Sequence, residues 1–176
     1  MNNEQEESAM NNGLTFHEEF LKELIMEAAS SRKCLERIPE KLFSWKPHER
    51  SMSMGSLTQI MAELPRWIKQ TVETPEIDFV KFGFIQPKTT FDLMKLFDDN
   101  LKGARTALQH TSDESLTEIF SVKNNGKVLL SSKKNESIVF SINHLVHHRG
   151  QLTVYMRLNN IPVPSIYGPS ADEGTY

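Results

Sequence analysis

The sequence SIVFSINHLVHHRGQLTVYM, residues 137–156, predicts the last helix of the fold and carries the chain's densest cluster of histidines. His144 and His148 stand four residues apart, so a helix places both imidazoles on one face, about one turn from each other, close enough to bind one metal ion. The apolar side chains that recur at helical intervals are Ile138, Ile142, Leu145, Leu152, Tyr155 and Met156.

The same pair of histidines is also compatible with ordinary packing in a helix that binds no metal. His147 lies about a hundred degrees around the helix from His148 and cannot share its face. Arg149 and Gln151 stand among apolar neighbours, where burial without partners is costly. This polar cluster predicts a cavity or an interface beside the helix.

Three further helices are predicted upstream. The first begins at Thr15, whose Thr-x-x-Glu spacing matches a capping box, and ends near Pro39. The second begins at Ser53 or Ser56, with Pro65 expected to kink or break it near Glu63. The third runs over about 90–110, and the fourth, which carries the histidines, over about 135–159. The side chains predicted to face the core are Phe20, Leu21, Leu24, Ile25, Ala28 and Leu35 in the first helix, and Phe91, Met94, Phe97, Leu101, Ala104 and Leu108 in the third.

A short β-hairpin is predicted before the last helix. Residues 119–122 and 128–130 are apolar segments that flank Asn124-Asn125-Gly126, a favourable sequence for a tight turn. Residues 43–50 and 74–88 are predicted to be loops. The predicted fold class is therefore mainly α: an up-down four-helix bundle with a short β-hairpin before the last helix.

Length and composition favour one domain over residues 14–176, preceded by a disordered polar tail over residues 1–13. The net charge of −3 comes without a basic face, which argues against a nucleic-acid partner. No apolar run reaches the roughly 18 residues that cross a bilayer, and the acidic N-terminus is unlike a secretory signal. The single cysteine, Cys34, fits a reducing cytoplasm and a packing role.

Several segments of the chain resemble the DinB family. Residues 143–152 are similar to that family's last helix, and residues 158–169 to the segment that follows it. Residues 45–48 and 51–57 resemble the entry into its second helix, which the Ala62-Glu63-Leu64-Pro65-Arg66-Trp67 motif continues. The resemblance covers roughly residues 14–170.

The resemblance implies a four-helix bundle, commonly a homodimer, with a divalent metal such as nickel or zinc held by three histidines. Two of them match His144 and His148, and the third falls at the position of Ile60. Isoleucine offers no lone pair, so we expect either weaker metal binding, with more water around the ion, or no metal binding at all.

Glu63 lies one helical turn after Ile60 and could complete a set of two histidines and one carboxylate. Gln59 points about a hundred degrees away from Ile60. The alternative for Glu63 is a carboxylate on the helix surface, paired to Arg66 or Lys69.

Two functions remain open from the sequence. The resemblance implies a metal-dependent thiol transferase or hydrolase, in which His147 or Glu63 could orient a ligand or accept a proton. The alternative is a non-enzymatic dimeric bundle that acts as a binding or stress-response protein, with its histidines hydrogen-bonded in a small pocket. The sequence names no substrate.

Overall fold

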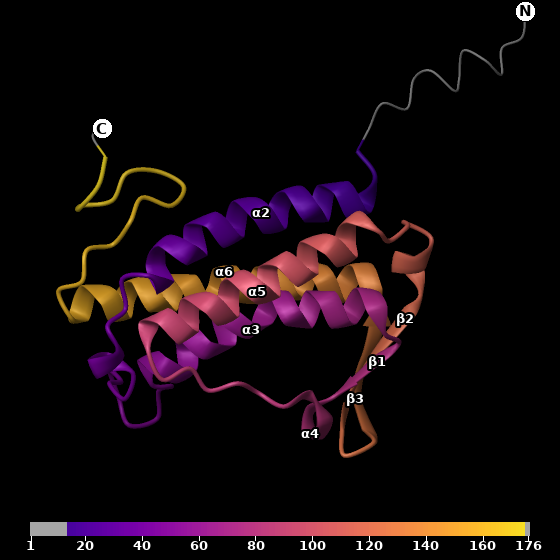
Figure 1. Cartoon of the computed structure of the whole chain (residues 1–176), viewed down its shortest axis with the longest axis horizontal. Coiled ribbons are helices and arrows are strands. Elements are labelled where there is room, and N and C mark those ends of the chain that lie inside the picture. The colour runs from indigo at the N-terminus through magenta and orange to yellow at the C-terminus, as the bar shows by residue number, and fades with distance from the viewer. Residues whose placement is uncertain (1–13, 175–176) are drawn as a thin grey trace, which may run out of the picture.

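The computed structural model describes residues 14–174 of the 176-residue chain. Its four long helices are α2 (Phe16–Leu35), α3 (Met54–Glu73), α5 (Thr90–Gln109) and α6 (Lys134–Leu158), which lie side by side in one bundle (Figure 1). The predicted mainly α four-helix bundle is confirmed. The predicted tail over residues 1–13 lies outside the described residues, and the single domain over 14–176 stays a prediction.

The helices are not packed in chain order. Both α2 and α3 pack against α5 and α6, so the consecutive helices α2 and α3 are diagonal to each other. After α3 the chain returns along the length of the bundle before α5 begins, so α3 and α5 run in the same direction and do not alternate as the predicted up-down order would have them (Figure 1). This return segment, residues 74–89, covers one side of α3. It also forms part of the wall of the cavity described below.

The predicted helix starts are confirmed. At α2, the Thr15 backbone N–H and hydroxyl both donate to the Glu18 carboxylate, at 2.9 and 2.8 Å. Asp113 adds a distant cap, because its carboxylate accepts from the backbone N–H of Phe16 at 2.9 Å. At α3 the cap is Ser53, whose hydroxyl accepts from the Ser56 N–H at 3.1 Å. The contacts donated by the backbone N–H groups of Thr15, Phe16 and Ser56 satisfy donors at the helix start that have no partner within the helix.

Pro65 does not break α3, which continues as one helix through that position. A proline inside a helix removes one backbone donor and crowds the preceding turn. The adjacent carbonyl of Ala62 accepts from the side-chain amide of Asn100 on α5, at 2.8 Å. This contact supplies a hydrogen bond from the neighbouring helix next to the disturbed turn.

The predicted hairpin is confirmed, with longer strands than expected. Strands β2 (Ile119–Asn124) and β3 (Lys127–Lys133) are antiparallel, and Asn125 and Gly126 turn between them with φ of 50° and 78°. The prediction that residues 74–88 are only a loop is wrong. They contain β1 (Glu76–Asp78), which pairs parallel with β2, and one short helix, α4 (Phe79–Phe82). Three residues are too few to show a period in the sequence.

The core runs along the axis of the bundle, and two predicted core residues are wrong: Ile25 is 39% exposed and Phe91 76% exposed. In both helices the apolar residues extend over a larger part of the helix circumference than the part that is buried, and Ile25 and Phe91 fall outside the buried part. The fully buried apolar side chains from the four long helices include Leu24, Leu35, Met54, Leu57, Met61, Leu93, Phe97, Leu108, Ile138, Leu152 and Met156.

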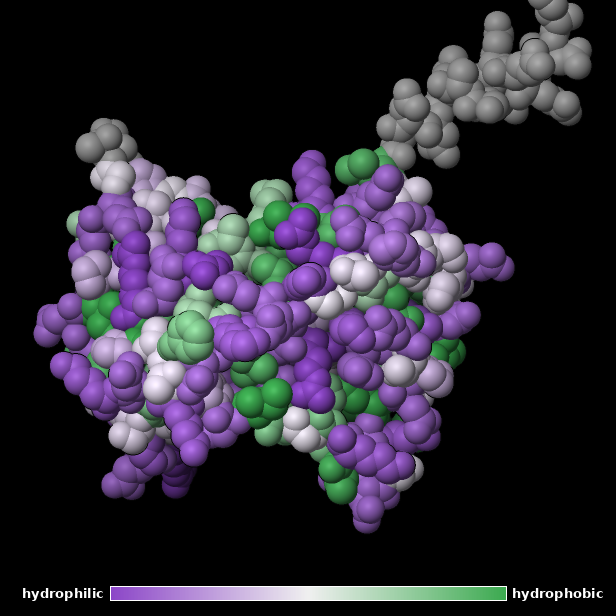
Figure 2. Space-filling model, viewed as in Figure 1, coloured by the Kyte–Doolittle hydropathy of each residue, from purple (hydrophilic) through white to green (hydrophobic). Residues whose placement is uncertain are grey.

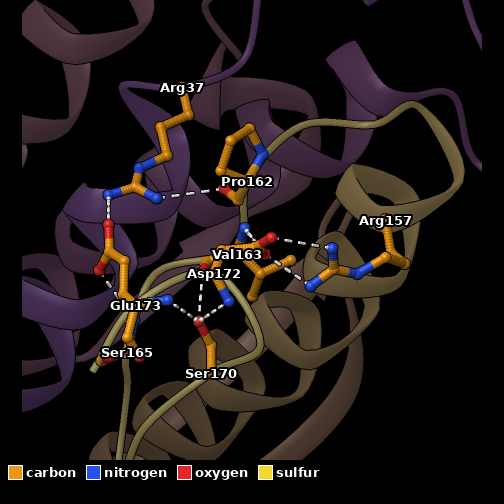
Figure 3. A network of polar contacts seen from close by, with 8 residues as sticks. All are labelled: Arg37, Arg157, Pro162, Val163, Ser165, Ser170, Asp172 and Glu173. Atoms are coloured by element: carbon orange, nitrogen blue, oxygen red, sulfur yellow. Dashed lines mark hydrogen bonds and ion pairs between the residues drawn. The ribbon is translucent and has the colours of Figure 1, made fainter. Parts of the chain in front are cut away.

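The segment after α6 folds back onto the bundle (Figure 3). Asp172 accepts from the Arg157 guanidinium at 2.6 Å and from the backbone N–H of Val163 at 2.8 Å. Glu173 pairs with Arg37, which also donates to the carbonyl of Pro162 at 3.1 Å. These contacts tie the C-terminal segment to the end of α6 and to the residues that follow α2.

Candidate functional site

A cavity of about 640 Å³ lies between α3, α6, the hairpin and the return segment. Its volume is within the range of roughly 300–1,000 Å³ that small-molecule sites occupy. Several lining side chains are exposed, among them Phe140, Leu129 and Phe84, so the cavity opens to solvent. The lining residues are Ile60, Glu63, Leu64, Trp67, Phe79, Phe84, Val122, Leu129, Leu130, Ser132, Glu136, Ser137, Phe140, Ser141 and His144.

The two predicted histidines lie together on α6, and one of them, His144, lines this cavity. The ring centroids of His144 and His148 are 4.4 Å apart, which confirms that the imidazoles share one helix face. His144 is half-buried and lines the cavity, whereas His148 is 5% exposed and lies one turn further along α6. Metal binding by this pair stays a prediction.

The contact with Gln151 determines which tautomer His148 adopts. Its amide oxygen lies 2.8 Å from His148 Nδ1, and because that oxygen can only accept, the proton belongs on Nδ1 and the lone pair on Nε2. Burial lowers the pKa of His148, an effect that the Gln151 contact opposes. Burial, followed by the neighbouring imidazoles, also lowers the pKa of His144. Both rings are therefore neutral at pH 7.

Glu63 is buried at 3% exposure, so the alternative that placed it on the helix surface is wrong. One carboxylate oxygen accepts from the backbone N–H of Ile85 at 3.0 Å, and the other lies 3.3 Å from Arg66. Of the two predicted partners, Arg66 is therefore the right one, while Lys69 pairs with Glu73. The main structural role of Glu63 is to hold the return segment against α3.

The donor set does not fit a three-ligand metal centre. Within residues 14–174, no three His, Cys, Asp or Glu side chains are grouped so that they could hold one metal ion. The Glu63 carboxylate already binds the Ile85 N–H and Arg66. Ile60 lines the same cavity as His144 but has only a hydrocarbon side chain. What remains is a pair of neutral imidazoles beside an apolar space.

Asp78, which the sequence did not single out, anchors the wall formed by the hairpin. Its carboxylate accepts from the backbone N–H groups of Gly126 at 2.8 Å and of Asn125 and Val80 at 3.0 Å each. These bonds, that to Gly126 foremost, lower the pKa of Asp78. One side chain thus joins the hairpin turn to α4. No signal in the sequence links positions so far apart.

In the rest of the polar cluster on α6, His147 is exposed and contacts the His148 ring, with centroids 5.3 Å apart, whereas Arg149 has a structural role. The Arg149 side chain is buried, pairs with Glu27 on α2, and donates to the Tyr167 hydroxyl at 2.5 Å. It does not line the cavity. Cys34 is buried too, and burial raises the pKa of its thiol to about 11, which agrees with the predicted packing role.

The sequence and the fold match one family of proteins. The model of the DinB family covers residues 9–175. This chain belongs to the DinB family. This DinB family member is 41% identical over 64 residues to the uncharacterized protein YrdA of Bacillus subtilis (strain 168). The matched residues span 36% of this chain and 33% of YrdA.

Two solved DinB-like proteins share the fold. One from Bacillus cereus ATCC 10987 has a TM-score of 0.65 and 23% identity, covering 84% of this chain and 95% of that one. The protein YjoA of Bacillus subtilis has the same TM-score at 17% identity, covering 84% of this chain and 96% of YjoA. At these identities the likeness concerns the fold alone.

The surface of this DinB family member is mixed. Polar side chains dominate the face seen in Figure 2, with apolar groups between them, including some on the projection that the hairpin forms. None of the helices within residues 14–174 combines the length and apolarity needed to cross a membrane.

Proposed function

We propose that this protein binds a small, largely apolar organic molecule in the cavity between α3, α6 and the hairpin. The observation that carries the proposal is the lining itself, in which apolar side chains from separate elements surround a space large enough for such a molecule. An apolar cavity of this size, open to solvent, gains free energy when a hydrophobic ligand displaces its water.

His144 supplies a polar contact for the ligand. Within the described residues its ring nitrogens have no hydrogen-bond partner, and its ring contacts are those with Phe140 and His148. A neutral imidazole can donate one hydrogen bond and accept another. A ligand with one polar group and an apolar body therefore matches the site.

The test uses fluorescence from inside the cavity. Trp67 lines the cavity, whereas Trp45 packs against Tyr155 away from it, so Trp45→Phe leaves Trp67 as the single tryptophan reporter. Titration of this variant with uncharged phenylnaphthylamine is expected to quench Trp67 and enhance the probe. Ile60→Phe, which fills the cavity, should weaken binding, whereas the matched Ile25→Phe on α2 should not.

Two results would count against the proposal. One is the absence of saturable probe binding to a protein that melts cooperatively. The other is equal binding by the Ile60→Phe and Ile25→Phe variants, which would place the probe elsewhere. Thermal melts of both variants separate loss of the cavity from loss of the fold.

The second candidate is the metal-dependent thiol transferase or hydrolase that DinB membership suggests. It draws support from His148, whose contact with Gln151 leaves Nε2 free in the orientation that metal-binding histidines use. With two donors the expected affinity is weak. Stoichiometric nickel or zinc after purification without chelator, lost in a His144→Ala, His148→Ala double variant, would favour this candidate. Metal-free protein at micromolar metal would favour the binding protein.

A further inference from the structure

The charged side chains that line the cavity all carry the same sign. Two carboxylates line it, Glu63 on α3 and Glu136 near the start of α6. Among the residues that the structure describes, no lysine or arginine lines it. An anionic ligand would leave water for a site that offers it no opposite charge, which costs free energy.

Arg66 offsets the charge of Glu63 only in part. The nearest approach between them, from Arg66 Nη1 to a Glu63 oxygen, is 3.3 Å. The guanidinium gives a shorter hydrogen bond, of 2.6 Å, to the carbonyl of Phe82, and it stacks on the Phe82 ring at 4.1 Å. It is also more exposed than the carboxylate, so solvent screens it more strongly.

Glu136 is exposed and stands at the rim. Its carboxylate accepts from the Lys133 backbone N–H at 3.0 Å, which holds it at the first turn of α6. No ion pair involving its side chain is found within residues 14–174. A negative charge therefore faces whatever enters the cavity.

The apolar lining is also rich in aromatic rings, from Trp67, Phe79, Phe84 and Phe140. Trp67 and Phe79 pack together with centroids 5.4 Å apart. The faces of such rings carry negative partial charge and attract cations, most strongly where water is excluded. The carboxylates and the rings thus favour the same kind of ligand.

We propose that the cavity selects a hydrophobic organic monocation, of the alkylammonium or arylammonium class, with Glu136 at the rim and the aromatic rings around its apolar body. This inference rests on the proposed function, since it names the class of molecule that the cavity takes. It also separates this site from a merely apolar one, which would prefer an uncharged molecule of the same shape.

The experiment compares two molecules of the same shape. Benzyltrimethylammonium and its uncharged carbon isostere, neopentylbenzene, each compete with phenylnaphthylamine for the Trp45→Phe protein. We expect the cation to displace the probe at about tenfold lower concentration. Glu136→Gln should reduce that preference, because glutamine keeps the hydrogen bond to the Lys133 N–H and removes only the charge. Glu49→Gln, an exposed carboxylate outside the cavity, is the matched control.

Each outcome has one meaning. A preference for the cation that falls in Glu136→Gln and persists in Glu49→Gln supports the proposal. Equal or better displacement by neopentylbenzene overturns it while leaving the proposed function intact, as does a preference that Glu136→Gln leaves unchanged. Failure of phenylnaphthylamine itself to bind removes the proposed function and this inference with it.

Discussion

Arg149 on α6 and Glu27 on α2 form an ion pair of 2.6 Å, in which the arginine side chain is 2% exposed and the glutamate side chain 12% exposed. Arg149 also donates to the backbone carbonyl of Glu27 at 3.0 Å, and the Tyr167 hydroxyl donates to the Glu27 carboxylate at 2.8 Å. One guanidinium therefore joins two helices and the C-terminal segment. Arg149 thus stabilises the fold, whereas His144, earlier on α6, lines the cavity.

Arg149→Met should destabilise the protein by about 3–5 kcal/mol, because it leaves the Glu27 carboxylate buried without its cation. Adding Glu27→Leu should recover much of that loss, since it removes the stranded charge. Urea unfolding measures both effects. Arg32→Met is the control: it breaks an exposed pair with Asp98 and should cost less than about 1 kcal/mol. Similar losses for Arg149→Met and Arg32→Met would contradict this account.

Ile60→His should tighten zinc binding by orders of magnitude, because it adds a third imidazole to the cavity that His144 lines. Calorimetric titration with zinc at neutral pH compares it with the wild-type protein. Gln59→His adds the same side chain one residue away, at a position that does not line the cavity, and should leave the affinity near that of the wild type. Equal affinities for all three proteins would show that position 60 cannot complete the pair.

Cys34 should be almost inert toward disulfide reagents in the native protein. With a pKa of about 11, only about one thiol in a thousand is ionised at pH 8, and burial hinders attack further. The reaction, followed by absorbance, should become fast in urea. In the unfolded chain the thiol has its ordinary pKa of 9.0, so it ionises at lower pH than the native thiol. The contribution of Cys34 to the free energy of unfolding therefore falls as the pH rises from about 9 to 11. Rapid native reaction at pH 8 would rule out the buried position.

A homodimer is expected from membership of the DinB family. Light scattering at micromolar concentration should give twice the mass of one chain. On dilution, the measured mass should fall toward that of one chain as the dimer dissociates. The structure of one chain leaves exposed apolar side chains that an interface could cover, among them Val80, Ile85 and Val128. A mass of one chain throughout the dilution series would argue for a monomer.

Local sequence determined most of the helical framework of this protein. Capping at Thr15 and Ser53, the period of the apolar residues and the Asn125-Gly126 turn depend on neighbours within a few positions, so their signals are readable in the chain. The adjacency of His144 and His148 follows from the same cause, because helix geometry alone places residues four apart on one face.

The tertiary structure decided what surrounds those histidines. Whether Glu63 coordinates a metal or binds the Ile85 N–H depends on where the return segment lies, and contacts with α3 and the hairpin set that path. The pairing of β1 with β2 and the Asp78 contacts to the hairpin turn bring together residues more than forty positions apart. Local propensity carries no information about such pairings, because packing in three dimensions selects them. The sequence thus placed two imidazoles on one helix, and only the assembled fold placed them beside an apolar, carboxylate-lined cavity.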